Sequence, residues 1–239
     1  MALDLNTIKQ IDFPEDHFFK TSQAKKQIVI HHTAGNDNIS GIVEGWKERT
    51  DKVCVSFIIA ADGTINQLFS SDFWAYHLGL RTDFLKAQGF SDSGIRNDFL
   101  NKLTIGIEIT NWGPVTKVGD KYYNYVGGEM NPGEVVEYEN PFKQVPASPF
   151  NDANRTSNKP CTFYHSYTAE QIVSLKDLLL HLCEKFNIPK DYHDEMWDVS
   201  FSALRGDAGI WTHVSYRTDK SDCHPQSELI DMLTGLSGN

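Results

Sequence analysis

Cysteine is scarce in this sequence and shows no pairing pattern. The 239 residues include four cysteines, with irregular spacing and no CxxC pair. Such a pattern argues against the disulfide framework that small exported proteins use, and it is consistent with synthesis in the cytosol. The four are Cys54, Cys161, Cys183 and Cys223.

Long apolar runs are also missing. No stretch approaches the roughly 20 apolar residues that a membrane-spanning helix needs. The opening MALDLN has neither the basic region nor the apolar region of an export signal. We therefore expect no membrane span and no signal peptide.

Positive charge is in short supply. Lys and Arg total 22 against 32 Asp and Glu, a net charge of −10, and no basic cluster compensates. A nucleic-acid partner is therefore not expected, because its phosphates would be repelled. A hydrophobic share of 40% with 12% aromatic residues nevertheless indicates a folded chain, long enough for one domain with a sizeable core.

Three short apolar runs indicate buried strands, and each carries a chemically active side chain. Residues 27–32 end on His31 and His32, residues 103–110 contain Glu108, and residues 209–213 end on His213. A carboxylate within a buried strand is costly unless it is paired. We therefore favour a functional role for Glu108 over an ion pair with a nearby Lys or Arg.

The strongest helix signal covers residues 168–186. Thr168 and Gln171 form a capping box, and apolar residues then recur at spacings of three and four. Shorter helices are expected near 40–50 and 228–233, whereas 81–101 indicates an irregular loop with a short helical piece.

These elements predict an α/β fold with a central mixed β-sheet flanked by helices on both faces. Further strands are expected at 53–59 and 65–69, on either side of a turn at Asp62 and Gly63. We expect a single domain over 1–239, with an N-terminal arm (1–26) and an irregular insertion (113–162) rich in Gly, Pro, Asn and Tyr.

Two strand-terminal histidines and a cysteine offer the donors of a catalytic zinc site. These are His31, His213 and Cys223, the last of which follows the second histidine in a polar loop. Zinc takes imidazole and thiolate donors tetrahedrally, and a catalytic site leaves its fourth position to water. The alternative for each histidine is a hydrogen-bonded core residue.

Five motifs occur in the order seen in one known family. They are IVIHHTAG from residue 28, FIIAADGTI from 57, WAYHLG from 74, LTIGIE from 103 and GIWTH from 209. In this order they resemble the zinc-dependent N-acetylmuramoyl-L-alanine amidases of type 2, a family that includes peptidoglycan recognition proteins and phage endolysins. The resemblance covers about residues 25–235 without the insertion.

The resemblance implies a ligand set for Zn²⁺. His31 and His213 match the first two ligands, and Cys223 matches the third, where family members place a Cys or Asp just before a Pro. Here His224 intervenes before the proline, so Asp222 is the alternative third ligand.

The resemblance also implies the other site residues. Glu108 matches the general base, and Lys220 matches the family's lysine if Asp222 binds the metal. His77 and Thr33 would contact substrate. The implied reaction is hydrolysis of the amide between N-acetylmuramic acid and L-alanine of peptidoglycan or a muropeptide, by a monomer.

Two other functions are weighed against this one. A non-catalytic peptidoglycan-binding module of the same fold would lack the third ligand, and the absence of HExxH argues against the common zinc peptidases. A phage endolysin, made in the cytosol and released to the cell wall, fits the absent signal peptide. A bacterial enzyme that acts on imported wall fragments is the alternative.

Overall fold

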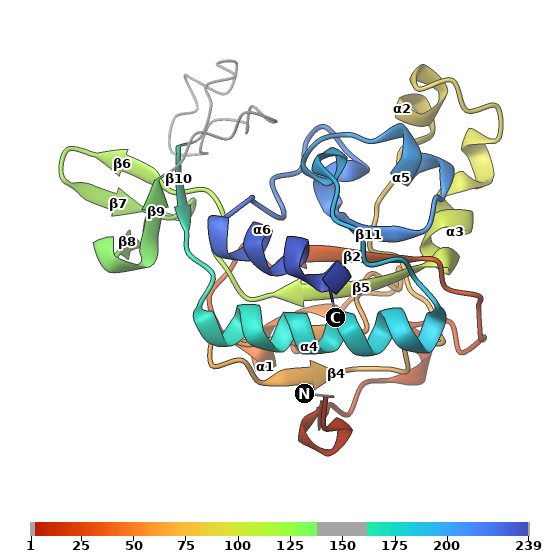
Figure 1. The fold of residues 1–239 in the computed structure, drawn as a ribbon, viewed down its shortest axis with the longest axis horizontal. Helices are drawn as coiled ribbons and strands as arrows, with labels where there is room; N and C mark the ends of the chain where they lie inside the picture. Colours follow the sequence, from red (N-terminus) through yellow and green to blue (C-terminus); the bar gives the residue numbers. More distant parts are fainter. Residues whose placement is uncertain (1–2, 138–161, 239) are drawn as a thin grey trace.

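A six-stranded sheet forms the centre of the structure, a computed structural model that describes residues 3–137 and 162–238 (Figure 1). Only β3 and β4 pair antiparallel, and every other neighbouring pair is parallel, so the sheet is mixed as predicted. The strand order is β1 (Lys9–Gln10), β4 (Ile65–Gln67), β3 (Phe57–Ile59), β5 (Thr104–Ile109), β2 (Gln27–His32) and β11 (Gly209–Thr212).

The two faces of the sheet pack against different helices. Phe57 and Ile59 of β3 belong to the main apolar core, to which α4 (Ala169–Phe186) and α6 (Ser227–Thr234) contribute. Ile58, between them, belongs to a second cluster with Val43 of α1 (Ile39–Lys47). Because successive side chains of a strand point to opposite faces, helices cover both sides of the sheet, which confirms the predicted fold class.

The capping box predicted for the longest helix is present. The Thr168 side chain accepts from the backbone N–H of Gln171 at 3.0 Å, and the Gln171 side chain accepts from the backbone N–H of Thr168 at 3.0 Å. The buried residues of α4 recur at helical spacing, and Asn187 ends it in the left-handed conformation. Local sequence thus fixes both ends of this helix.

Residues 81–101 differ from the predicted irregular loop. They form α2 (Thr82–Ala87) and most of α3 (Ser93–Leu103). Only Ser93, Leu100 and Asn101 of α3 are buried, so the helix lacks the apolar stripe by which sequence patterns reveal helices. A further short helix, α5 (Phe201–Arg205), precedes β11.

The predicted arm adds a strand to the central sheet, and the described part of the insertion contributes to smaller sheets. Residues of the arm form β1, which extends the central sheet beside β4. The described part of the insertion forms β6 (Thr116–Val118), β7 (Lys121–Tyr123) and β8 (Glu129–Met130), and β9 (Val135–Glu137) pairs with β10 (Phe163–His165). Residues 138–161 lie outside the described residues.

Short 3₁₀ helices complete the described chain. They are Leu5–Thr7, Glu15–His17, Pro132–Glu134, Asp194–Trp197, His213–Ser215 and Gly235–Gly238.

Within residues 3–137 and 162–238, no helix has the length and apolar character needed to cross a bilayer.

Candidate metal centre and active-site pocket

The sheet brings the three chemically active strands together. The neighbouring strands β11, β2 and β5 are parallel, so their carboxyl ends meet at one edge of the sheet. His31 lies opposite Glu108 in the β2–β5 register, and His213 directly follows β11. His31 and Glu108 are 77 positions apart in the chain, and Glu108 and His213 are 105 apart, yet all three residues line one pocket.

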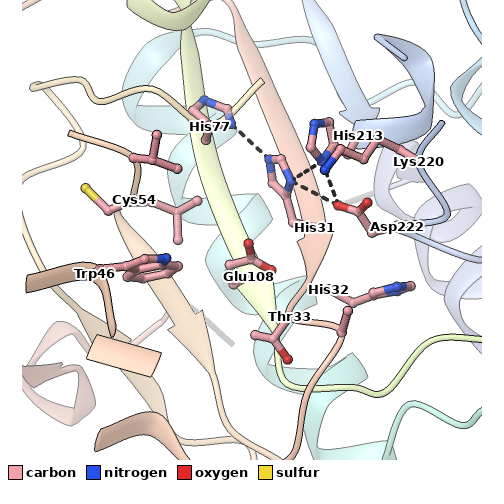
Figure 2. A pocket seen from close by; sticks show the side chains of 13 residues that line it. His31, His32, Thr33, Trp46, Cys54, His77, Glu108, His213, Lys220 and Asp222 are labelled. Carbon is pink, nitrogen blue, oxygen red and sulfur yellow. Dashed lines mark hydrogen bonds and ion pairs between the residues drawn. The ribbon is translucent and has the colours of Figure 1, made fainter. Parts of the chain in front are cut away.

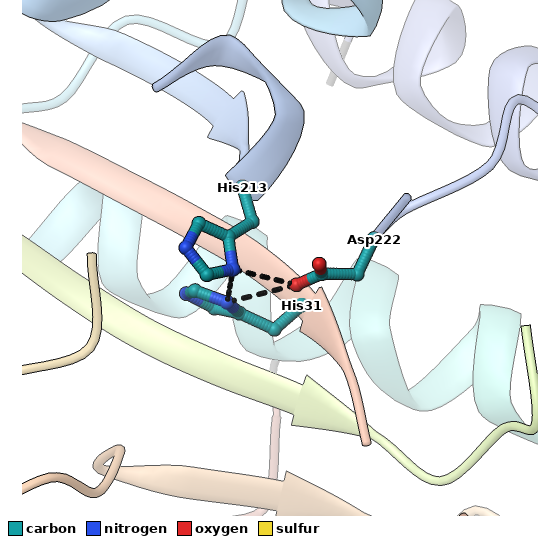
Figure 3. Close-up of side chains that lie close together, drawn as sticks. All are labelled: His31, His213 and Asp222. Atoms are coloured by element: carbon teal, nitrogen blue, oxygen red, sulfur yellow. Dashed lines mark hydrogen bonds and ion pairs between the residues drawn. The ribbon is translucent and has the colours of Figure 1, made fainter. Parts of the chain in front are cut away.

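Two histidines and one aspartate converge on a single point (Figure 3). His31 Nδ1 lies 3.0 Å from His213 Nδ1 and 3.1 Å from Asp222 Oδ2, and His213 Nδ1 lies 2.8 Å from the same oxygen. All three residues are buried. Burial lowers the pKa of His31 to about 4, so its imidazole is neutral near pH 7, the form that binds metals.

Burial and the neighbouring histidines have opposite effects on the pKa of Asp222. Burial alone would raise the pKa of its carboxyl group, but the His213 and His31 rings beside it hold that pKa well below its ordinary value. The site thus offers a carboxylate and two imidazoles, a set of donors that suits a divalent transition metal.

The third position of this cluster differs from the expectation. Cys223, matched by resemblance to the third ligand, packs in the main apolar core with 2% of its surface exposed, and burial raises the pKa of its thiol well above the ordinary value. The geometry instead brings Asp222 to the histidines. Adjacent residues in a loop point in different directions, so the softer donor has no advantage when it faces the core.

Glu108 lies in the same pocket, beside His31 (Figure 2). Its Oε2 is buried and has no hydrogen-bond partner among the described residues. Burial, followed by the nearby charge of Asp222, raises the pKa of Glu108 well above its usual value, and the positive charge of Lys220 opposes this shift. A buried carboxylate oxygen without a partner is a candidate for proton transfer.

Lys220 and Thr33 line the pocket as well. The Thr33 side chain accepts from the backbone N–H of Asn111 at 3.2 Å, which holds the loop after β2 against the end of β5. Lys220 precedes Asp222 by two residues, so the candidate metal ligand and this ammonium group come from one loop. The catalytic role of Lys220 and the substrate contact of Thr33 stay predictions.

Both ring nitrogens of His77 lie within hydrogen-bond distance of other side chains. Its Nδ1 lies 2.9 Å from His31 Nε2, and its Nε2 lies 2.7 Å from the Thr104 hydroxyl. Gly106 makes room for the ring, because a Cβ there would lie 3.2 Å from His77 Cγ and 2.7 Å from a Val55 methyl group. Substrate contact by His77, the role predicted from resemblance, would have to use a ring face or edge.

The second histidine of the opening motif points elsewhere. Figure 2 shows His32 directed away from the His31 ring, and its Nδ1 lies 3.3 Å from the Tyr167 hydroxyl. His31 and His32 are consecutive strand residues, so they leave the sheet on opposite faces.

The pocket has a volume of about 240 Å³ and includes residues that were not among the predicted site residues. Trp46, in the helix predicted near residues 40–50, lies on its wall with Cys54 and Val55. An aromatic wall beside polar groups is typical of a ligand site. A Trp at helical spacing gives no sequence signal that separates this role from ordinary packing.

A family model described as N-acetylmuramoyl-L-alanine amidase matches residues 21–225 of the chain. The chain belongs to the N-acetylmuramoyl-L-alanine amidase family. This assignment confirms the resemblance drawn from the five motifs. As predicted, the protein is a peptidoglycan amidase that acts in cell-wall lysis. It is therefore an enzyme and not only a binding module.

Solved structures similar to this amidase share little sequence with it. PlyL has a TM-score of 0.48 and 13% identity, with 97% of this chain and 98% of that chain covered. LysC, an N-acetylmuramoyl-L-alanine amidase from Clostridium intestinale, has a TM-score of 0.46 and 13% identity over 94% and 93%. The Staphylococcus aureus hydrolase AmiA in complex with its ligand has a TM-score of 0.49 and 14% identity over 99% and 84%. No curated protein sequence matches the chain.

Proposed function

We propose that this amidase is a zinc enzyme whose metal is held by His31, His213 and Asp222. The observation that carries the proposal is the convergence of three buried ligand atoms beside the unpartnered carboxylate of Glu108. This ligand set uses Asp222 in the place that resemblance gave first to Cys223.

The residues present fit such an ion. Ligand atoms about 2.0–2.1 Å from a tetrahedral zinc are about 3.3 Å apart, close to the 2.8–3.1 Å between the three atoms here. His213 Nε2 lies 3.0 Å from the backbone carbonyl of Leu78, which only accepts hydrogen bonds, so Nε2 carries a proton and Nδ1 is the nitrogen available to a metal ion.

The chain's own residues have complementary tasks in amide hydrolysis. When bound, zinc would supply Lewis-acid chemistry, polarising the scissile carbonyl and making water more acidic. Glu108 would accept a proton from the attacking water and deliver it to the nitrogen of L-alanine as the C–N bond breaks. The ammonium group of Lys220 would stabilise negative charge on the carbonyl oxygen. Thr33 and the wall that includes Trp46 would orient the substrate.

The proposal extends to the setting of the enzyme. The substrate is peptidoglycan or a muropeptide, cut between the lactyl group of N-acetylmuramic acid and L-alanine, by one amidase domain over residues 1–239 acting as a monomer. A phage endolysin, made in the cytosol and released to the bacterial wall, is the setting we favour. The bacterial enzyme for imported wall fragments is the second candidate.

Mass spectrometry of purified peptidoglycan digests tests the proposal. We expect new L-alanine amino termini and muramic acid with a free lactyl carboxyl group. A chelator should abolish both products, and added Zn²⁺ should restore them. Cleavage between amino acids of the stem peptide, or cleavage of peptides without muramic acid, would show a peptidase instead. Full activity in chelator would remove the metal from the proposal.

A further inference from the structure

One dipeptide contacts the outer nitrogen of both metal-site histidines. His213 Nε2 lies 3.0 Å from the carbonyl oxygen of Leu78, and His31 Nε2 lies 2.9 Å from Nδ1 of His77. The two rings therefore face their Nδ1 atoms inward, toward Asp222, and their Nε2 atoms outward, toward residues 77–78. The placement of this dipeptide controls the orientation of both rings.

Asn101 of α3 fixes the dipeptide. Its Oδ1 accepts from the backbone N–H of His77 at 2.8 Å and from that of Leu78 at 3.2 Å. Its Nδ2 donates to the carbonyl oxygen of Asn97 at 2.7 Å, which sets the orientation of the amide. Asn101 is fully buried, so these bonds do not compete with water. Residues 77–78 belong to no helix or strand, and this side chain supplies the contacts that such an element would otherwise provide.

A chain of hydrogen bonds sets the tautomers. The Thr104 hydroxyl lies 3.3 Å from the carbonyl oxygen of Asn101, which can only accept, so Thr104 donates there. The hydroxyl then accepts from His77 Nε2–H at 2.7 Å, which leaves His77 Nδ1 as the acceptor of His31 Nε2–H at 2.9 Å. His31 Nδ1 is left without a proton, as a metal ligand must be.

We propose that Asn101 and Thr104 are positioning residues of the metal centre, which orient His31 and His213 and fix their tautomers through the His77–Leu78 dipeptide. Neither residue lines the pocket, so neither contacts substrate. The inference rests on the proposed zinc site and adds to it the residues that prepare the site before the ion binds.

Zinc affinity, measured by competition with a chromophoric chelator, tests the proposal. Thr104→Val preserves shape and removes the hydroxyl, so we expect a loss of about 10–100-fold in affinity, the usual effect of removing a hydrogen bond behind a metal ligand. Thr104→Ser keeps the hydroxyl and should remain within about threefold of the wild type. Asn101→Ala should also lose about 10–100-fold.

A matched control separates positioning from general stability. Asn66 is buried as well and donates to the carbonyl oxygens of Ile58 and Thr64 at the other side of the sheet. Asn66→Ala should lower the melting temperature while leaving zinc affinity unchanged. If Asn101→Ala does not fold, the comparison of Thr104→Val with Thr104→Ser still tests the proposal, because neither Thr104 substitution leaves a backbone N–H without a partner.

A spectroscopic measurement on the zinc-free protein tests the tautomers directly. Long-range ¹H–¹⁵N correlation spectra at neutral pH should show His31, His77 and His213 protonated on Nε2 in the wild type and Thr104→Ser, with mixed tautomers of His77 in Thr104→Val. Unchanged tautomers and unchanged zinc affinity in Thr104→Val would overturn the inference. A wild type with the expected tautomers but no zinc binding would instead overturn the proposed function.

Discussion

His31 and Glu108 are register partners on the adjacent parallel strands β2 and β5. Their side chains therefore leave the sheet on the same face, and both reach the pocket. The pairing places a carboxylate beside His31 without making it part of the His31, His213 and Asp222 group. In the proposed function, binding an ion and moving a proton therefore fall to residues on neighbouring strands.

Glu108→Gln should separate these functions. The amide has the shape of the carboxylate but cannot take the proton of the attacking water, so we expect activity to fall by about 10²–10⁴-fold. Zinc content, measured by elemental analysis after dialysis, should match that of the wild type. Near-full turnover of peptidoglycan by this variant would remove Glu108 from the mechanism.

The third ligand is decided by comparing two neighbouring residues. Asp222→Asn keeps the shape but removes the charge, so the variant should lose most of its zinc on dialysis and most of its activity. Cys223→Ala should retain the zinc and show only a loss of stability of about 1 kcal/mol, as is usual for a small buried side chain. The opposite pattern would restore Cys223 as the ligand.

Lys25 should make stability depend on pH. Burial lowers the pKa of its ammonium group to about 7, an effect that the charge of Asp72 partly opposes. An unfolded lysine has a pKa of about 10.4, so between these values the unfolded chain binds more protons and the free energy of unfolding rises with pH.

Urea unfolding at several pH values from 6 to 10 measures this effect. The stability of the wild type minus that of Lys25→Met should increase above pH 7 by at most about 1.4 kcal/mol per pH unit. The hydrogen bonds from Lys25 to the carbonyl oxygens of Lys102 and Thr104 favour the ammonium form, so they narrow the pH range over which the difference rises. Lys26→Met, at an exposed neighbour, is the control. A flat difference for Lys25→Met would contradict the expectation.

Helix α4 offers a test of the main core. Leu179 is fully buried there, so Leu179→Ala should lower the free energy of unfolding by about 2–5 kcal/mol. Val173, on the same helix, is 60% exposed, and Val173→Ala should change the free energy of unfolding by no more than about 0.5 kcal/mol. Equal effects of the two substitutions would show that α4 does not pack as described.

The sequence alone indicated the strands and the helix that build the sheet and its cover. Apolar runs ending in His31 and His213, a carboxylate inside a strand at Glu108 and the capping box at Thr168 are local patterns, and each was found where it was predicted. Such patterns are readable because strand alternation and helix capping depend on residues close in the chain. The family resemblance rested on the same motifs.

Only the tertiary structure decided which side chains meet. The choice between Asp222 and Cys223 depends on the path of a loop, and softness as a ligand does not determine which of two adjacent residues faces the histidines. The link from Asn101 through residues 77–78 to both rings joins segments that are far apart in the chain. The sequence of α3 has no apolar stripe that would predict a helix, because its buried positions include Asn101, whose polar side chain bonds to backbone groups. Local patterns therefore determined the scaffold, and long-range packing brought together the residues of the candidate metal centre.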